Sequence, residues 1–201
     1  MLQGAEPGST LRIVHLIKTI IMKRIIAIAA SLMTLAAATW FCNRSPDPAA
    51  LFARYHQPGA EQQRAQKIIP TLESQGLAGV QTESDSLRDA LQFYADGDFA
   101  EAEKRLKIYL ESNPEDQLAQ YFLGATYMNL GNYAKAVDVF SPLSHAESPL
   151  KNDALWNLGL CYLKMENGIH EARLAFEKLS ADNAFKKRQD AKALLEQLPV
   201  Q

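Results

Sequence analysis

The side chains best suited to chemistry are four histidines and two cysteines, and their spacing argues against a catalytic or metal site. His170-Glu171 begins the pattern of a zinc-protease helix, but the second histidine that such a helix needs is missing. Cys42 and Cys161 lie too far apart in the sequence to suggest a disulfide, and we expect Cys161 to be a small buried thiol. There is no glycine-rich phosphate loop and no Gly-x-Ser-x-Gly elbow. The sequence therefore predicts no enzyme, no metal and no cofactor.

The distribution of charge excludes a second class of function. Of 21 basic and 23 acidic residues, four basic and one acidic lie within residues 1–42. The remaining 17 basic and 22 acidic residues give residues 43–201 a net charge of −5. An acidic domain without a basic stripe is a poor nucleic-acid binder, so we expect a protein partner instead.

The most informative pattern is a repeat of 34 residues. Gly97, Phe99, Ala102 and Leu106 are followed, in the same order and 34 positions later, by corresponding residues. These are Gly131, Tyr133, Ala136 and Phe140. A repeat of this length is typical of a helical hairpin, and stacked hairpins form binding surfaces.

The pattern resembles the tetratricopeptide repeat, whose unit carries Leu-Gly-x-x-Tyr, a Gly turn, and then an aromatic, Ala and Phe at fixed intervals. The second unit fits best, with Leu123, Gly124, Tyr127, Gly131, Tyr133, Ala136 and Phe140. The third contains Leu158, Gly159, Tyr162, Ala172 and Phe176, whereas the first has Asp89 and Ala90 where Leu-Gly is usual. The resemblance implies an all-α fold, a right-handed superhelix of about three antiparallel hairpins over residues 83–201. Its units would be 83–116, 117–150 and 152–184, followed by a capping helix at 185–198.

The residue types in these slots have a physical reason. Gly124 and Gly159 are small enough to let two helices approach closely, while Phe140 and Phe176 fill the space between them. Each turn contains a glycine for the left-handed conformation, with Asp98, Asn132 or Asn167 available to cap the next helix.

The N-terminal part carries an apolar segment, residues 25–42, behind Met22-Lys23-Arg24. Residues 22–42 are either a transmembrane anchor, with the basic residues on the cytoplasmic side, or a signal peptide cleaved after Ala38. A lipid-modified Cys42 and a buried cytosolic helix are further alternatives. Residues 1–21 form an N-terminal extension or result from a misassigned start. Both leading interpretations place the repeats outside the cytoplasm, facing the periplasm from the inner membrane or exported.

Residues 43–82 are predicted to be a linker with partial helix. Leu51 to Tyr55 and Glu61 to Leu77 could be helical, with Pro58 and Pro70 limiting their extent. The alternative is a flexible stalk. The segment Leu51-Phe52-x-x-Tyr55 also resembles the aromatic stretch that follows the membrane helix in some membrane-anchored bacterial tetratricopeptide proteins.

The resemblance also implies a concave groove lined by the first helix of each unit. On this chain its residues are Leu87, Leu91, Tyr94, Tyr121, Ala125, Met128, Asn129, Trp156, Leu160, Leu163 and Lys164. Such an apolar, aromatic groove favours a hydrophobic peptide or helix as ligand. Two alternatives remain: Tyr121 and Trp156 pack against a neighbouring helix, or the linker folds back over the groove. The charged clamp for a C-terminal carboxylate is not reproduced, because Leu87 and Leu91 occupy its slots.

These observations predict a non-catalytic protein-interaction scaffold tethered at the bacterial cell envelope through residues 25–42. The alternatives are a structural protein that self-associates and an accessory subunit of an envelope enzyme complex.

Overall fold

The computed structural model describes residues 18, 22–26, 29, 33, 46–75 and 81–199 and divides the chain into two units, 1–44 and 45–201. In the first unit the described residues are helical, and Met22, Ile25, Ile26 and Met33 are exposed. Within the described ranges, no helix has the length and hydropathy needed to cross a membrane. Most of residues 1–42, including Cys42, lies outside the described residues. The predictions made for the extension at 1–21 and for the segment 22–42 fall largely there.

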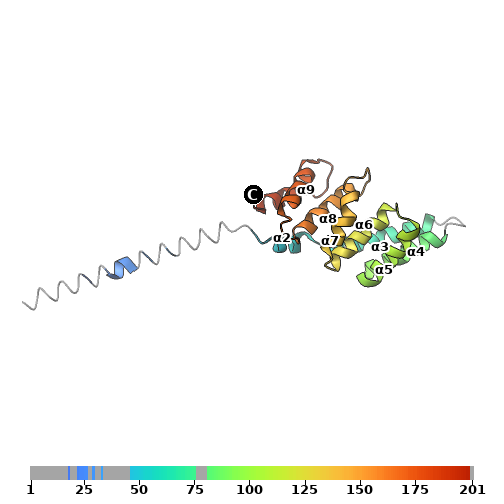
Figure 1. Ribbon diagram of the computed structural model, residues 1–201, viewed down its shortest axis with the longest axis horizontal. Coiled ribbons are helices and arrows are strands. Elements are labelled where there is room, and N and C mark those ends of the chain that lie inside the picture. The colour runs from blue at the N-terminus through green and yellow to red at the C-terminus, as the bar shows by residue number, and fades with distance from the viewer. Residues whose placement is uncertain are drawn as a thin grey trace, which may run out of the picture. The chain divides into compact units, whose positions relative to one another are not determined.

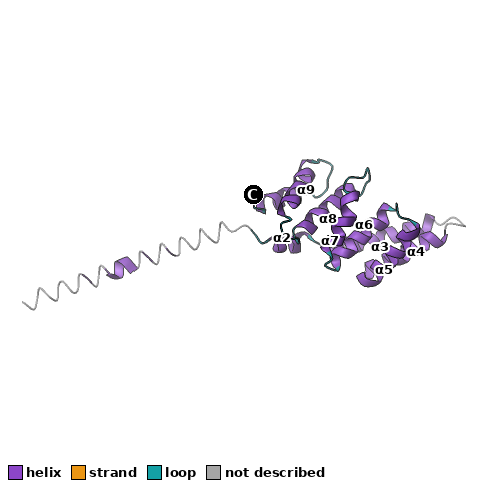
Figure 2. Cartoon of the chain, in the orientation of Figure 1, coloured by secondary structure: helices purple, strands orange, loops and turns teal. Residues whose placement is uncertain are grey.

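The second unit is built from helices alone over its described residues (Figure 2). The helices are α2 (Pro48–Tyr55), α3 (Pro58–Gln75), α4 (Gln81–Asp96), α5 (Phe99–Ser112), α6 (Gln117–Asn129), α7 (Tyr133–Leu143), α8 (Lys151–Tyr162), α9 (Ile169–Ala181) and α10 (Arg188–Gln197).

Six of these helices form three consecutive hairpins: α4–α5, α6–α7 and α8–α9 (Figure 1). Each helix from α4 to α9 packs on the next one in the chain, and α10 closes the series by packing on α9. The first helices of the hairpins, α4, α6 and α8, also contact one another and form one continuous surface. The predicted all-α stack of hairpins is confirmed, and a terminal helix covers its last unit.

The pairing of small with large residues holds the hairpins together as predicted. A Cβ atom on Gly124 would lie 2.7 Å from Cζ of Phe140, and one on Gly159 would lie 2.9 Å from the Phe176 ring. Both phenylalanines are fully buried. The two rings therefore occupy the space that only glycine leaves free.

The turns between paired helices follow the expected chemistry in part. Gly97 and Gly131 have φ values of 85° and 75°, and the Asp98 side chain accepts a hydrogen bond from the Glu101 amide. Asn132 makes no such cap. In the third unit Asn167, with φ 59°, takes the left-handed conformation expected of the glycine. Gly168 is required for another reason, because its Cβ would lie 2.2 Å from the Tyr162 carbonyl oxygen.

The segment before the repeats is folded, since residues 46–75 form two packed helices rather than a stalk. The Asp47 side chain caps α2 by accepting a hydrogen bond from the Ala49 amide. Pro58 is the first residue of α3, where its missing N–H needs no partner. The helix continues through Pro70, which was expected to limit it. In Figure 1 α3 lies beside α4, and α2 lies near the C-terminal helices.

Candidate functional site

The predicted groove residues come together on the surface formed by α4, α6 and α8. Leu87, Leu91 and Tyr94 lie on α4; Tyr121, Ala125, Met128 and Asn129 on α6; Trp156 and Leu160 on α8; Leu163 and Lys164 directly after α8. Lys164 is exposed and Asn129 is partly buried, whereas all the others are buried. Part of this burial comes from neighbouring helices, because the Tyr121 ring meets Phe140 of α7 and the Trp156 ring meets Phe176 of α9. Helices α2 and α3 supply further contacts.

Helix α2 covers the end of this surface near α8. The Tyr55 ring meets the indole of Trp156 edge-on, with 6.1 Å between centroids, and the Phe52 ring meets Tyr133 at 5.3 Å. The Lys164 ammonium lies 5.5 Å from the centroid of the Phe52 ring. Leu51 and Phe52 are buried as a result.

The turn between α2 and α3 contributes His56. Its Nε2 lies 3.3 Å from Oδ1 of Asn129, and its ring stacks on Phe52. Burial lowers the pKa of His56, although the hydrogen bond with Asn129 opposes that shift. His56 therefore joins the cover as a neutral imidazole at pH 7.

Helix α3 crosses the surface from α8 to α4, and Arg64 is its central contact. The guanidinium Nη1 donates a hydrogen bond of 2.7 Å to Oδ2 of Asp153 on α8. The same group lies over the Tyr121 ring of α6, 5.0 Å from its centroid. On the same helix α3, Ala65 is fully buried, and the Gln62 side chain donates a hydrogen bond to the Ala95 carbonyl oxygen of α4. One helix of the linker thus touches all three repeat units.

In the contact between α3 and the repeats, Glu61 lacks a hydrogen bond at one of its carboxylate oxygens. Its Oε2 atom is buried without a hydrogen bond and lies 3.9 Å from the Arg64 guanidinium. Burial raises the pKa of Glu61 even though Arg64 favours the ionised form. Burial and the nearby Glu61 also raise the pKa of the Tyr121 hydroxyl.

Beneath the cover, two tyrosine hydroxyls are each paired with an asparagine of the following unit. Asn129 donates a hydrogen bond to the Tyr94 hydroxyl at 3.2 Å, and Asn157 donates one to Tyr121 at 3.1 Å. Because buried polar groups must find partners, these pairs fix the register between neighbouring units. Asn129 and Asn157 therefore support the surface from within.

Little space remains between the linker helices and the repeats. A cavity of about 10 Å³ is left at the junction, between Tyr55 and Glu61 on one side and Tyr94, Met128 and Trp156 on the other. That volume holds at most one water molecule. The linker of the same chain fills the predicted groove. This arrangement corresponds to the alternative in which the linker folds back over the groove.

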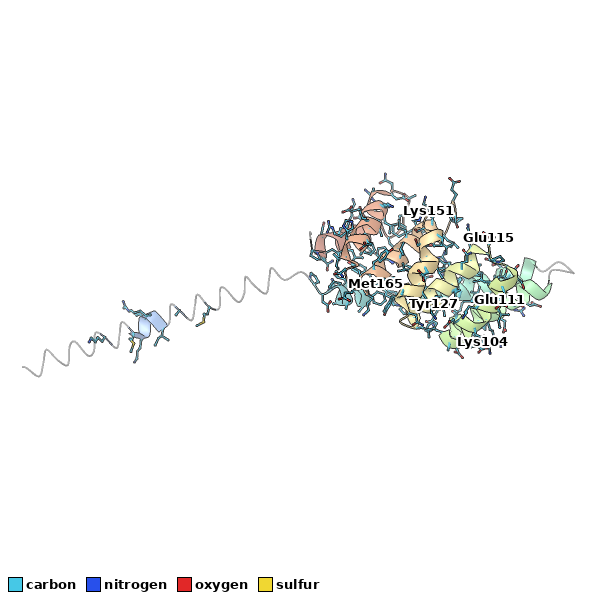
Figure 3. The ribbon with its side chains drawn as sticks, viewed as in Figure 1. Lys104, Glu111, Glu115, Tyr127, Lys151 and Met165 are labelled. Carbon is cyan, nitrogen blue, oxygen red and sulfur yellow. The ribbon has the colours of Figure 1, made fainter. Side chains whose placement is uncertain are left out.

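Several shallow hollows open at the surface of the unit. One of about 410 Å³ lies between α4 and α5 and is lined by Lys104, Arg105 and the exposed Ile108. Another, of about 350 Å³, lies along α5 and includes Lys104 and Glu111, which Figure 3 labels. A third, of about 630 Å³, lies at the start of α8. Among the described residues no three His, Cys, Asp or Glu side chains are grouped to hold a metal ion. Cys161 is fully buried, and burial raises the pKa of its thiol far above the ordinary value.

Sequence reasoning missed the linker's own contribution to this surface, namely His56, Glu61 and Arg64, together with Asp153 opposite them. A signal was present, because four apolar residues of α3 follow the spacing of one helix face. These are Ala65, Ile68, Ile69 and Leu72, all of which pack against the core. The polar residues between them concealed the pattern.

Comparison with known proteins agrees with this architecture. The family model described as Tetratricopeptide repeat matches residues 87–141 and again residues 126–184, which together span α5 to α9 and most of α4. No curated protein and no solved structure matches the chain. The matched residues include the Gly124–Phe140 and Gly159–Phe176 pairs that interlock the hairpins. Residues 87–184 are therefore tetratricopeptide repeats, of a family whose repeats serve as protein-interaction modules.

Proposed function

We propose that this chain is a non-catalytic protein-interaction scaffold tethered at the bacterial cell envelope, which binds an apolar helix or extended segment of a partner on its concave surface. The observation that supports it best is the packing of α2 and α3 on α4, α6 and α8. In this packing α2 supplies aromatic side chains and α3 supplies one arginine, which supports amphipathic segments of this kind as ligands. Peptide recognition by a helix laid in a groove uses the same physics.

The tether is supported by the sequence of residues 22–42, a basic head followed by an apolar stretch of membrane-spanning length. If that segment anchors the protein, the intact chain sediments with membranes after a carbonate wash, and added protease reaches the repeats only from the periplasmic side. A mature protein that starts at Thr39 would instead indicate a cleaved signal, and protection of the repeats in spheroplasts would contradict the envelope location.

The binding surface can be tested by photo-crosslinking in living cells. A photoreactive residue at Lys164, on the exposed rim of the groove, is compared with one at Lys107 on the outer face of α5. We expect Lys164 alone to give an adduct of discrete mass, containing a second protein that mass spectrometry identifies. Equal adducts from both positions would refute the groove assignment. An adduct of two copies of the chain would favour the self-associating alternative.

A further inference from the structure

The contacts of α2 and α3 go beyond those of a repeat helix. Helix α3 packs on its successor α4, as each helix from α4 to α9 packs on the next, but its Arg64 also reaches α6 and α8, so that α3 contacts the first helices of all three units. The helix pair also precedes the repeats in the sequence, so its removal would leave the series of hairpins continuous.

Besides the apolar face of α3 that packs against the core, the attachment contains two aromatic contacts and one ion pair. Phe52 and Tyr55, three positions apart on α2, meet Tyr133 and Trp156. Arg64, nine positions beyond Tyr55, bonds Asp153. Such rings and arginines are the residues that dominate binding energy at protein interfaces.

The same attachment contains an element that weakens it. Glu61 is buried with its Oε2 unbonded, and burial of an ionised carboxylate disfavours any state that contains it unless the charge is fully compensated. The ion pair of Arg64 is itself about one third exposed on each side, so solvent screens it. Both features lower the net stabilisation that the polar contacts of this attachment provide.

On this basis, and resting on the proposed function, we propose that α2 and α3 are an internal ligand that occludes the concave groove. The partner is a protein segment that reproduces their face, with two aromatic residues three positions apart and an arginine about nine positions further on, and it binds by displacing them. Because the internal copy is tethered, its effective concentration is on the order of millimolar, and an external segment competes against it.

The test uses the purified full chain in detergent micelles and, as probe, a fluorescent peptide with the sequence of residues 47–75. Binding is measured by fluorescence anisotropy to the natural chain and to the double variant Phe52→Ala, Tyr55→Ala, whose own α2 is loosened. We expect the loosened chain to bind the peptide on the order of tenfold more tightly or better, because more of it is in the open state. Lys67→Ala, which removes an exposed positive charge from the neighbouring helix α3, is the control and should bind like the natural chain.

Each outcome decides one claim. Equal affinity of the peptide for both chains would overturn occlusion while leaving groove binding intact. Absence of binding to either chain would overturn groove binding itself, and the internal ligand with it. If circular dichroism shows that the double variant does not fold, Arg64→Ala replaces it with the same expectation, since it removes the bond to Asp153 and keeps the apolar face.

A second readout follows the cover of Trp156 by α2 directly. In a Trp40→Phe background Trp156 is the single tryptophan, and its indole is covered by Tyr55. Acrylamide should quench its fluorescence more strongly in Tyr55→Ala than in Lys67→Ala. Adding the peptide of residues 47–75 to the Tyr55→Ala chain should restore the protection. Quenching that is the same in all three samples would refute the assignment of α2 as a displaceable cover.

Discussion

Single residues set the distance between helices in this stack, and Gly124 is the clearest case. Its missing Cβ leaves the space that the Phe140 ring fills. We expect Gly124→Ala to lower the free energy of unfolding by about 1–3 kcal/mol, because the added methyl group forces the ring or the helix to move. Urea denaturation followed by circular dichroism measures the change.

Gly59→Ala is the control for that substitution. Gly59 lies on α3, and a Cβ there meets nothing within 4 Å. Alanine at this helical position should leave the stability unchanged or raise it by about 0.5–1 kcal/mol. Equal losses in the two variants would mean that close packing at Gly124 does not limit the fold.

Glu61 should make the stability of the chain depend on pH. Burial raises its pKa above the ordinary 4.5, so its contribution is fully present below pH 4.5 and is lost as the pH rises through the raised value. Arg64, Asp153, Tyr121 and Lys187 face this carboxyl group. We therefore expect Glu61→Gln to gain stability over the natural chain as the pH increases from 4 to 8.

The measurement for Glu61 is the unfolding free energy of both chains at several pH values. Glu111→Gln, on the exposed face of α5, is the matched control. A difference between the Glu61→Gln and natural chains that stays constant over this range, or that shrinks with rising pH, would contradict a buried carboxyl group at the interface.

At the scale of elements, the repeats were the part that the sequence predicted best. Hairpins over α4 to α9 follow from glycine and aromatic positions that recur at intervals of 34 to 37 residues, since each slot constrains the next. The capping helix was also predicted, although α10 begins at Arg188 and the buried Phe185 precedes it. The predicted range, 185–198, is longer than α10 because Phe185 packs from the turn before the helix.

The linker shows why the rest was harder to predict. The sequence predicted partial helix at 51–55 and 61–77, with a flexible stalk as the alternative, because local propensity reports on the isolated segment. The apolar stripe from Ala65 to Leu72 gains its meaning only once α4 lies beside it, and Pro70 is tolerated within that packed helix. Whether a groove is empty or filled depends on such long-range contacts, which a repeat pattern does not encode.

Helix α10 should protect the last repeat unit from local unfolding. Leu194 is fully buried where α10 packs on α9. Leu194→Ala should cost about 2–5 kcal/mol. Because each unit of a stack depends on its neighbours, the loss should appear first as faster amide hydrogen exchange in α8 and α9. The exposed Gln189 supplies the control, Gln189→Ala, and uniform acceleration across all helices would contradict this local effect.

At the scale of the whole unit, the filled groove removes the reason for self-association. Over the described part of residues 45–201, the large exposed apolar side chains are few: Ile108, Leu130, Met165 and Leu174. They lie on different helices or loops, and single exposed apolar residues need no partner. We therefore expect residues 45–201, which form a compact unit with its own core, to be monomeric.

Size-exclusion chromatography with light scattering tests this expectation over a hundredfold range of protein concentration. The natural unit should keep the mass of one copy throughout. The variant Phe52→Ala, Tyr55→Ala exposes Trp156 and Tyr133, so its mass should rise with concentration as the open groove of one copy receives α3 or apolar surface of another. A natural unit that dimerises as readily as the variant would show that α2 and α3 do not shield the groove, and would favour the self-associating structural role over the scaffold.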